Sequence, residues 1–346
     1  MTPQNPAPYR VLVADDSTFM RRVLAQSLAE SGFDVVGEAA DGDEALALWR
    51  ELKPDAMTLD LAMPGLDGMG VLRALDGKAA SIPIVVVSAF SPSHGARAVD
   101  ALAEGAFDLV AKPAFGEPID AFIEELREKV GAAAKSAGPH VAMPRHPHAV
   151  QHHAARPDRV HLIVSSTGGP RALGELIPEL PSPLGSGGMI VQHMPAGFTL
   201  SLSARLDRSS TLGVTEATDG ALLAPDTLLM APGGSHLRLT PDGDGARVQI
   251  SGADPVGGLR PRADLTIVDA AAIFGERLLL VVLTGMGRDG LLGARAVREA
   301  GGSIYVESAE TCTVYGMPRV IAEAGLADEE LPLSELALAI AEGARA

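Results

Sequence analysis

The sequence predicts an α/β protein with two parallel-sheet domains, and two observations lead to that fold class. Short apolar runs alternate with helix-length segments from Arg10 to Val130, and the same alternation resumes from Arg159 onward. Near-continuous apolar strands separated by helices are typical of parallel sheets that helices cover on both faces. We therefore expect an N-terminal domain over residues 9–130, a flexible linker over 131–158 and a C-terminal domain over 159–346.

Five apolar runs in the first half have the length and composition of buried strands. They are Val11–Asp15, Asp34–Ala39, Ala56–Leu61, Ile84–Ala89 and Asp108–Lys112. Helical patterns lie between them, for example at Phe19–Glu30, Glu44–Leu52 and Ala96–Glu104. Such sheets carry their functional residues at the carboxyl ends of the strands, so those ends are where chemistry is expected.

The stretch between the two halves lacks this pattern. From Gly131 to Pro157 the chain has no acidic residue, four prolines and five of its nine histidines. A histidine-rich tract can bind metal ions, but irregular spacing and dispersed prolines favour a flexible linker.

Five further apolar runs predict the strands of the second sheet. They are Val160–Ser166, Met189–Met194, Thr227–Ala231, Leu278–Thr284 and Ser303–Glu307. The segment from Leu239 to Ile250 contains a turn sequence rich in Pro, Asp and Gly, which predicts a β-hairpin. The second domain is thus expected to be a doubly wound α/β domain with a hairpin excursion.

Composition narrows the classes of function. A net charge of −16 argues against nucleic-acid binding and against a DNA-binding output domain. The single cysteine, Cys312, permits no intramolecular disulfide and fits a reducing cytoplasm. No apolar stretch approaches the roughly 20 residues that span a bilayer, and the N-terminus lacks a signal-peptide pattern. We expect a cytoplasmic monomer that is not inserted in a membrane.

Acidic residues end two neighbouring strands of the first half. Asp15 and Asp16 close the first strand and Asp60 closes the third. Three carboxylates at one sheet edge repel one another unless a hard cation such as Mg²⁺ lies among them. Ser88 and Lys112 end the fourth and fifth strands and add a hydroxyl and an ammonium group to the same edge. This set predicts a phosphoryl-accepting carboxylate at Asp60.

These residues resemble the receiver domain of two-component response regulators. The resemblance rests on Val-Ala-Asp15-Asp16-Ser17, Asp60-Leu-Ala-Met-Pro-Gly-Leu-Asp-Gly68, Ser88-Ala89 and Ala-Lys112-Pro113. It implies a five-stranded flavodoxin-like sheet, Mg²⁺ held by Asp15, Asp16 and Asp60, and Asp60 as phospho-acceptor. It also implies a switch role for Ser88 and Lys112. Leu109 stands where many receivers have an aromatic switch residue.

A serine marks the start of the second half. Ser166 follows an apolar run and precedes Thr167-Gly168-Gly169-Pro170, a sequence suited to a strand-to-helix turn. Glycines there let backbone N–H groups approach a developing oxyanion. Taken alone, the motif also fits a structural turn serine.

A nucleophilic serine needs a base and an orienting carboxylate. His193 and Asp289 also follow apolar strands, so all three side chains are expected at one sheet edge. Taken alone, His193 also fits a surface histidine and Asp289 a helix cap. His161 and His236 compete for the base role, but His161 begins its strand and His236 lies in a glycine-rich loop.

Two other functions are compatible with the second half. Gly285-x-Gly287-x-x-Gly290 after a strand, with Glu307 ending the next one, matches a dinucleotide-binding pattern and would make an oxidoreductase. Asp289 inside that turn would repel a pyrophosphate, however. A non-enzymatic scaffold controlled by the first domain is the third interpretation.

The second half resembles the protein-glutamate methylesterase of bacterial chemotaxis, the CheB family. The matching segments are Ser166-Thr-Gly-Gly, Gln192-His193-Met-Pro-Ala-Gly-Phe-Thr199, Ala231-Pro-Gly-Gly-Ser-His236-Leu, Thr284-Gly-Met-Gly-Arg-Asp289-Gly and Cys312-Thr-Val-Tyr-Gly-Met-Pro318. The family joins a receiver to this esterase domain, so the resemblance covers nearly the whole chain.

This resemblance implies a phosphorylation-activated serine hydrolase. Ser166 would be the nucleophile, His193 the base and Asp289 its orienting carboxylate, with the Met286 N–H in the oxyanion hole and Thr167 lining the site. The expected reactions are demethylation of glutamyl methyl esters on chemoreceptors, with release of methanol, and deamidation of receptor glutamines. A chemotaxis histidine kinase would be the phosphodonor. The esterase would need no cofactor, and Mg²⁺ would serve only the receiver.

Two departures from the family pattern stand near these residues. Ser165 replaces the usual alanine and places a second hydroxyl beside Ser166. Arg260-Pro-Arg262-Ala-Asp264 stands where Arg-Pro-Ser-Val-Asp is usual, which is expected to alter substrate contacts.

Overall fold

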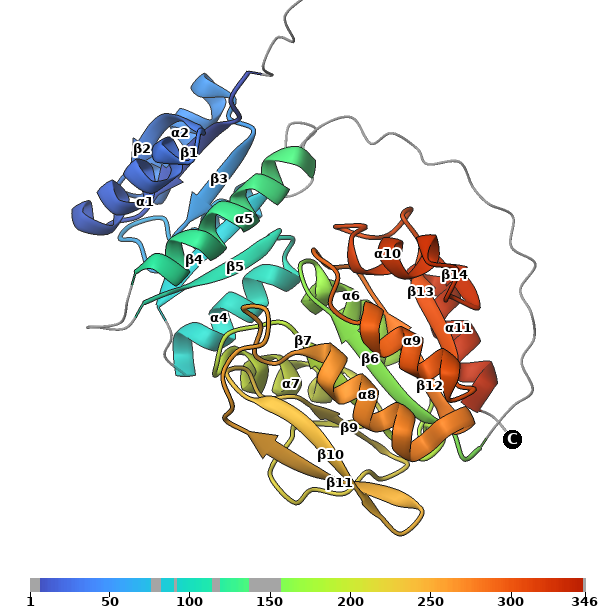
Figure 1. The fold of residues 1–346 in the computed structure, drawn as a ribbon. Helices are drawn as coiled ribbons and strands as arrows, with labels where there is room; N and C mark the ends of the chain where they lie inside the picture. Colours follow the sequence, from blue (N-terminus) through green and yellow to red (C-terminus); the bar gives the residue numbers. More distant parts are fainter. Residues whose placement is uncertain (1–6, 76–81, 90–91, 114–118, 137–156, 345–346) are drawn as a thin grey trace, which may run out of the picture. The chain divides into compact units, whose positions relative to one another are not determined.

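The computed structural model describes residues 7–75, 82–89, 92–113, 119–136 and 157–344 of the chain. The chain divides into two compact units, Met1–Val141 and Ala142–Ala346. Each unit is built around its own sheet, as Figure 1 shows in blue to green for the first and yellow-green to red for the second.

The first unit holds a five-stranded parallel sheet in the order β2-β1-β3-β4-β5. Its elements are β1 (Arg10–Ala14), α1 (Thr18–Glu30), β2 (Asp34–Ala39), α2 (Gly42–Leu52), β3 (Ala56–Leu59), α3 (Gly68–Leu75), β4 (Ile84–Ala89), α4 (Pro92–Ala103), β5 (Asp108–Lys112) and α5 (Asp120–Ser136). Helix α1 packs with α5, whereas α2, α3 and α4 pack in series. The connection from β1 to β2 runs toward one edge of the sheet, and the later connections run toward the other edge. Because such connections are right-handed, α1 and α5 lie on one face of the sheet and α2, α3 and α4 on the other.

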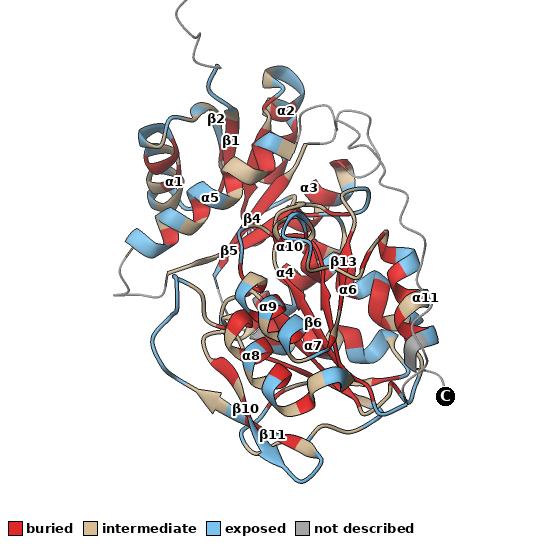
Figure 2. Ribbon diagram, turned by 45° about the vertical axis from the view of Figure 1, so that its right-hand side comes forward, coloured by how far each residue is buried: buried red, intermediate tan, exposed pale blue. Residues whose placement is uncertain are grey.

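The second unit holds a seven-stranded sheet in the order β14-β13-β12-β6-β7-β9-β8, and all its pairings are parallel. Its strands are β6 (Val160–Ser165), β7 (Gly188–Gln192), β8 (Gly213–Glu216), β9 (Thr227–Met230), β12 (Leu278–Val282), β13 (Ser303–Glu307) and β14 (Glu329–Leu331). Its helices are α6 (Gly169–Leu176), α7 (Phe198–Ser209), α8 (Ala263–Phe274), α9 (Leu291–Glu299), α10 (Met317–Glu323) and α11 (Leu333–Ala344), with short 3₁₀ turns at Ile177–Glu179 and Gly275–Arg277. The central strands are buried and the helices bury one side, as the colouring of Figure 2 shows.

The predicted hairpin is a separate two-stranded sheet of β10 (His236–Asp242) and β11 (Gly245–Ser251). Asp242 pairs with Gly245, so the two residues Gly243 and Asp244 form the turn, and Gly243 has the positive φ of +58° that such a turn requires. Leu237, Leu239, Ala246 and Val248 join a core with α8 and the seven-stranded sheet. The hairpin therefore covers the face of the sheet on which α8 lies.

The predicted fold class is confirmed, and several strand bounds agree with the sequence. The bounds of β2, β4, β5 and β13 are those expected. Helix α5 continues through Gly131 to Ser136, six residues that the sequence placed in the linker, because Ala133 and Ala134 are buried against the first unit. Residues 137–156 of the expected linker, with its five histidines, lie outside the described residues. Within the described residues, no helix has the length and apolarity needed to cross a membrane.

Burial of His161 near the start of β6 makes the second unit sensitive to acid. Its side chain is fully buried and neither ring nitrogen has a hydrogen-bond partner among the described residues. Burial, and secondarily the charge of Arg159, lower the pKa of His161 from 6.5 to about 3. The unfolded chain binds a proton there as the pH falls below about 6.5, whereas the folded chain does not, so stability is full above that pH and is lost below it.

We expect that the unfolding free energy of the second unit falls by about 2 kcal/mol more between pH 7 and pH 5 in the wild type than in His161→Gln, which has no group to titrate there. Urea unfolding followed by circular dichroism measures the difference. Trp49, the only tryptophan, lies in the first unit, so its fluorescence provides an internal control that should not distinguish the two proteins. Equal pH dependence of the two proteins would contradict the prediction.

Candidate active site and receiver site

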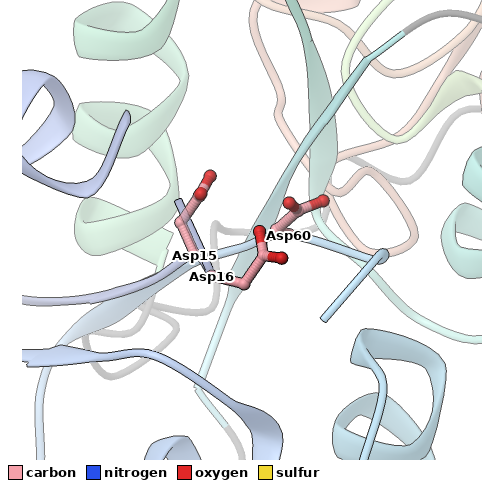
Figure 3. Close-up of side chains that lie close together, drawn as sticks. All are labelled: Asp15, Asp16 and Asp60. Carbon is pink, nitrogen blue, oxygen red and sulfur yellow. The ribbon is translucent and has the colours of Figure 1, made fainter. Parts of the chain in front are cut away.

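The structure brings the three predicted metal ligands of the first unit together. Asp15 and Asp16 follow β1 and Asp60 follows β3, and Figure 3 shows their side chains side by side. Carboxylate oxygens of all three lie within 4.8 Å of one another. Asp15 and Asp60 are buried, whereas Asp16 is exposed. Adjacent positions of β1 and β3 in a parallel sheet account for this convergence.

Lys112, the last residue of β5, neutralises part of this cluster. Its Nζ lies 2.7 Å from Asp15 Oδ2 and 2.6 Å from Asp60 Oδ2. Burial raises the pKa of Asp15, and the Lys112 ammonium only partly offsets that rise. Burial would lower the pKa of Lys112, but the two carboxylates outweigh it and raise the pKa, so the ammonium stays charged. Ser88 is buried near the end of β4, and its hydroxyl donates to the carbonyl of Ala89.

The acidic cluster fits a hard divalent cation. Its donors are carboxylate oxygens, which Mg²⁺ prefers, and the three carboxylates carry more negative charge than the single Lys112 ammonium compensates. The backbone N–H groups of Ser17 and Ala62 donate to Asp15 Oδ1 and Asp60 Oδ1, so the backbone holds one oxygen of each carboxylate while the other oxygen contacts Lys112. One cation among three carboxylates and one ammonium would remove the remaining repulsion.

In the second unit, Ser166 occupies a tight turn between β6 and α6. Gly168 has a φ of +78°, which glycine adopts without strain, and a Cβ there would collide with Thr313. The Ser166 N–H donates to the Thr284 carbonyl at 3.0 Å, and its carbonyl accepts from the Gly169 N–H at 2.8 Å. The backbone of Ser166 is thus fixed while its side chain remains partly exposed.

The neighbouring hydroxyl is in a different environment. Ser165 is fully buried, and its Oγ donates to Gln192 Oε1 at 2.6 Å. Gln192 Nε2 in turn donates to the carbonyls of Ser166 and His193, both at 2.9 Å. Gln192 therefore ties the ends of β6 and β7 together, and the second hydroxyl serves this tie instead of facing solvent.

His193 and Asp289 form the central polar contact of the site. His193 Nε2 lies 2.8 Å from Asp289 Oδ2. Both side chains are largely buried, and the His193 N–H donates to the Ser165 carbonyl at 3.0 Å. Because this contact uses Nε2, Nδ1 is the ring nitrogen that remains for a contact with another group. Ser166 Oγ itself makes no hydrogen bond with another residue of the described chain.

Two helix N-termini hold Asp289 in place. Its carboxylate accepts from the N–H groups of Ala263 and Asp264 at 2.7 and 2.9 Å, in the first turn of α8. In the same way, Asp264 Oδ1 accepts from the N–H groups of Gly290 and Gly293 at the start of α9. Burial raises the pKa of Asp289, but the hydrogen bond and charge of His193, together with these amides, lower it well below its usual range. Asp289 is therefore ionised at neutral pH.

Arg262 contacts both of these carboxylates. Its Nε lies 2.8 Å from Asp289 Oδ1 and its Nη2 lies 2.6 Å from Asp264 Oδ2. The sequence suggested that the departure at this position would change substrate contacts. The structure places the guanidinium on the carboxylate that also contacts His193, so Arg262 compensates buried charge within the site, and the change in substrate contacts stays a prediction.

The other predicted lining residues lie close to Ser166. A Cβ on Gly285 would approach the Ser166 Cβ to 2.7 Å, so only glycine permits this contact, and Met286 comes next in the chain. Thr167 is buried and its carbonyl accepts from Thr284 Oγ1 at 2.9 Å. Met286 remains partly exposed.

The structure removes the support for a dinucleotide-binding role. Glu307 is fully buried, and its Oε2 accepts from the Thr284 N–H at 2.7 Å. It therefore offers no carboxylate to a ribose, and Asp289 occupies the glycine-rich turn where a pyrophosphate would bind.

Neither competing histidine reaches the site. His161 lies at the opposite end of β6 from Ser166, as its place in the strand predicted. His236 is buried, its Nδ1 accepts from the Arg262 N–H at 3.1 Å, and its Nε2 contacts the Asp254 carbonyl at 3.1 Å. Both nitrogens of His236 are thus used in holding the segment that carries Arg262.

Sequence reasoning missed the positioning roles of Gln192, Thr284 and Glu307. All three are polar residues at or next to the ends of apolar strands, and each has at most 1% of its surface exposed. The signal that could have identified them is a polar residue at the end of an otherwise apolar strand. Such a residue is buried, and buried polar groups require hydrogen-bond partners.

Comparison with known proteins agrees with this architecture. The CheB methylesterase family model matches residues 161–340, and the response regulator receiver domain model matches residues 11–124. A protein-glutamate methylesterase/protein-glutamine glutaminase of Symbiobacterium thermophilum is 42% identical, covering 96% of each chain. One from Myxococcus xanthus is 42% identical over 94% of this chain and 95% of its own.

A solved structure supports the same assignment for the second unit. The crystal structure of the Thermotoga maritima CheB methylesterase catalytic domain covers 53% of this chain and 97% of its own, with a TM-score of 0.52 and 41% identity. The family models, the two full-length relatives and this structure cover both units. The chain therefore belongs to the CheB methylesterase family, with a response regulator receiver domain preceding the esterase domain.

Proposed function

We propose that this chain is a phosphorylation-activated protein-glutamate methylesterase that acts on chemoreceptors in the cytoplasm and also deamidates receptor glutamines. The observation that carries the proposal is the His193–Asp289 hydrogen bond at the strand ends that also present Ser166. Relatives of similar length that are named for both activities support it.

The proposed reaction is an acyl transfer in two halves. Ser166 Oγ attacks the γ-carbonyl carbon of the glutamyl ester, and its proton passes to His193 Nδ1, the nitrogen that Asp289 leaves available. The C–O bond to the methyl group's oxygen breaks, and His193 returns the proton to release methanol. Water then attacks the acyl-Ser166 with His193 again taking a proton, which frees the glutamate and restores Ser166. With a glutamine substrate, the leaving group is ammonia.

The remaining residues have supporting roles in this proposal. The Met286 N–H would donate to the oxyanion, and Thr167 would line the site. Asp289, ionised because its pKa is low, stabilises the imidazolium that forms in each half-reaction. Arg262 and the amides of α8 keep that carboxylate in position.

In the receiver, Asp60 would accept the phosphoryl group from a chemotaxis histidine kinase. Asp15, Asp16 and Asp60 would hold Mg²⁺, which neutralises charge on the transferring phosphoryl group. Lys112, already 2.6 Å from Asp60, would contact the phosphoryl oxygens, and Ser88 near the end of β4 would be the switch hydroxyl. The receiver would occupy residues 9–130 and the esterase residues 159–346.

The proposed function is tested by methanol release from membranes that carry methylated chemoreceptors. We expect release by the intact chain, and release roughly tenfold faster once acetyl phosphate and Mg²⁺ are added, a typical size for coupling between two sites. Unmethylated receptor membranes are the matched control. Absence of methanol under both conditions would overturn the esterase assignment, and an equal rate under both would overturn activation by phosphorylation.

A further inference from the structure

A pocket of about 570 Å³ lies beside the candidate active site without containing its three predicted catalytic residues. Its walls come from the loop after β12, from α9, from the segment that leads into α10 and from α10 itself, all in the second unit. Met286 is one of its lining residues, and the preceding residue, Gly285, packs against Ser166. The pocket therefore adjoins the backbone segment that packs against Ser166.

The charge of this pocket is opposite to that of the whole chain. Arg288, Arg295 and Arg319 line it and are exposed, with Glu323 as the only acidic lining residue. Arg319 Nη1 lies 3.6 Å from Glu323 Oε1, so those two charges compensate each other. Arg288 and Arg295 form no ion pair with any residue that the structure describes. Two uncompensated cations thus face a concave site on a protein of net charge −16.

The rest of the lining suits side chains rather than a free inorganic anion. Leu291, Val314 and Val320 also line the pocket and offer apolar surface. A glutamate side chain combines methylene groups with a terminal carboxylate, so it matches both kinds of surface, and arginine binds carboxylates well because of its planar set of donors.

We propose that this arginine pocket, defined by Arg288, Arg295 and Arg319, binds acidic side chains that flank the esterified glutamyl residue of the substrate protein. The proposal rests on the proposed esterase function and adds a determinant of substrate choice. The pocket selects esters that lie in acidic segments, because a carboxylate placed there gains two cations that have no partner in the free enzyme.

Two synthetic peptides test this selection directly. Each carries a single glutamyl γ-methyl ester, flanked in one peptide by glutamates and in the other by glutamines. Binding is measured by fluorescence anisotropy to the full-length chain in a Ser166→Ala background, with Mg²⁺ and acetyl phosphate present. We expect the glutamate-flanked peptide to bind at least roughly fivefold more tightly. That ratio should shrink at about 0.5 M salt, where exposed charges are screened.

Charge reversal identifies the pocket as the source of the preference. Arg295→Glu should abolish the preference, because it replaces one of the two uncompensated cations with an anion. Arg295 is an exposed residue of α9, so its replacement does not disturb the buried residues of the active site. Arg208→Glu is the matched control, since Arg208 is exposed near the end of α7, does not line the pocket and changes net charge equally. The proposal is overturned if the intact pocket shows no preference for the glutamate-flanked peptide. It is also overturned if the preference survives Arg295→Glu, or if Arg208→Glu removes it equally.

Failure of the proposal and failure of the proposed function are separable. Hydrolysis of N-acetylglutamate γ-methyl ester by the wild type reports the esterase alone, since this small ester has no flanking residues. Its hydrolysis together with a lack of peptide preference would reject the pocket only. A peptide preference without hydrolysis of either ester would support the pocket as an acidic-peptide site and reject the esterase.

Discussion

Ser166→Ala should lower the rate of methanol release by at least roughly a thousandfold, the scale found for nucleophiles that act within a triad. The structure sharpens this expectation, because Ser166 has a fixed backbone, a partly exposed side chain and a hydroxyl without a partner among the described residues. The measurement is the initial rate on methylated receptor membranes with phosphodonor present. Addition of His193→Ala should cost little more, since a triad acts as a unit.

Ser165→Ala is the matched control for this experiment. It removes a hydroxyl one residue away, but that hydroxyl is buried and donates to Gln192. The loss of one neutral hydrogen bond costs about 1 kcal/mol, so the rate should fall by less than roughly tenfold. Near-normal turnover by Ser166→Ala, or a larger loss in Ser165→Ala than in Ser166→Ala, would show that the nucleophile has been assigned wrongly.

Asp60→Asn should abolish phosphorylation of the receiver. The wild type incubated with radiolabelled acetyl phosphate and Mg²⁺ should carry an alkali-labile label, as an acyl phosphate does, and the variant should carry none. An amide has no anionic oxygen to attack phosphorus, and it leaves the Lys112 ammonium with only one of its two carboxylate partners. The acceleration of methanol release by phosphodonor should disappear in the same variant.

Asp67→Asn controls for general loss of acidity in this loop. Asp67 follows Asp60 by seven residues, but its carboxylate pairs with Arg97 and receives the Gly70 N–H instead of joining the three clustered carboxylates. It should keep the label. If the label persists in Asp60→Asn, another residue accepts the phosphoryl group. Lys112 would then not contact a phosphoryl group on Asp60.

Much of the fold and of the site follows from local sequence patterns. Apolar runs of five to seven residues predicted most strands, because buried parallel strands are largely apolar, and several bounds agree to the residue. The strands β8 and β14 were missed. They are edge strands of four and three residues with partly exposed positions, so their sequences carry little hydrophobic signal.

The sequence by itself determined which residues end the strands, and so predicted that Asp15, Asp16, Asp60 and Lys112 meet at one edge and that Ser166, His193 and Asp289 follow the strands of a second sheet. The reason is general, because right-handed crossovers bring the carboxyl ends of parallel strands to one edge. Only the tertiary structure decided which partner each polar group takes. Gln192 bridges 26 residues to Ser166, and Arg262 reaches 27 residues to Asp289. Such pairings depend on how helices and strands pack, and no periodicity in the chain encodes them.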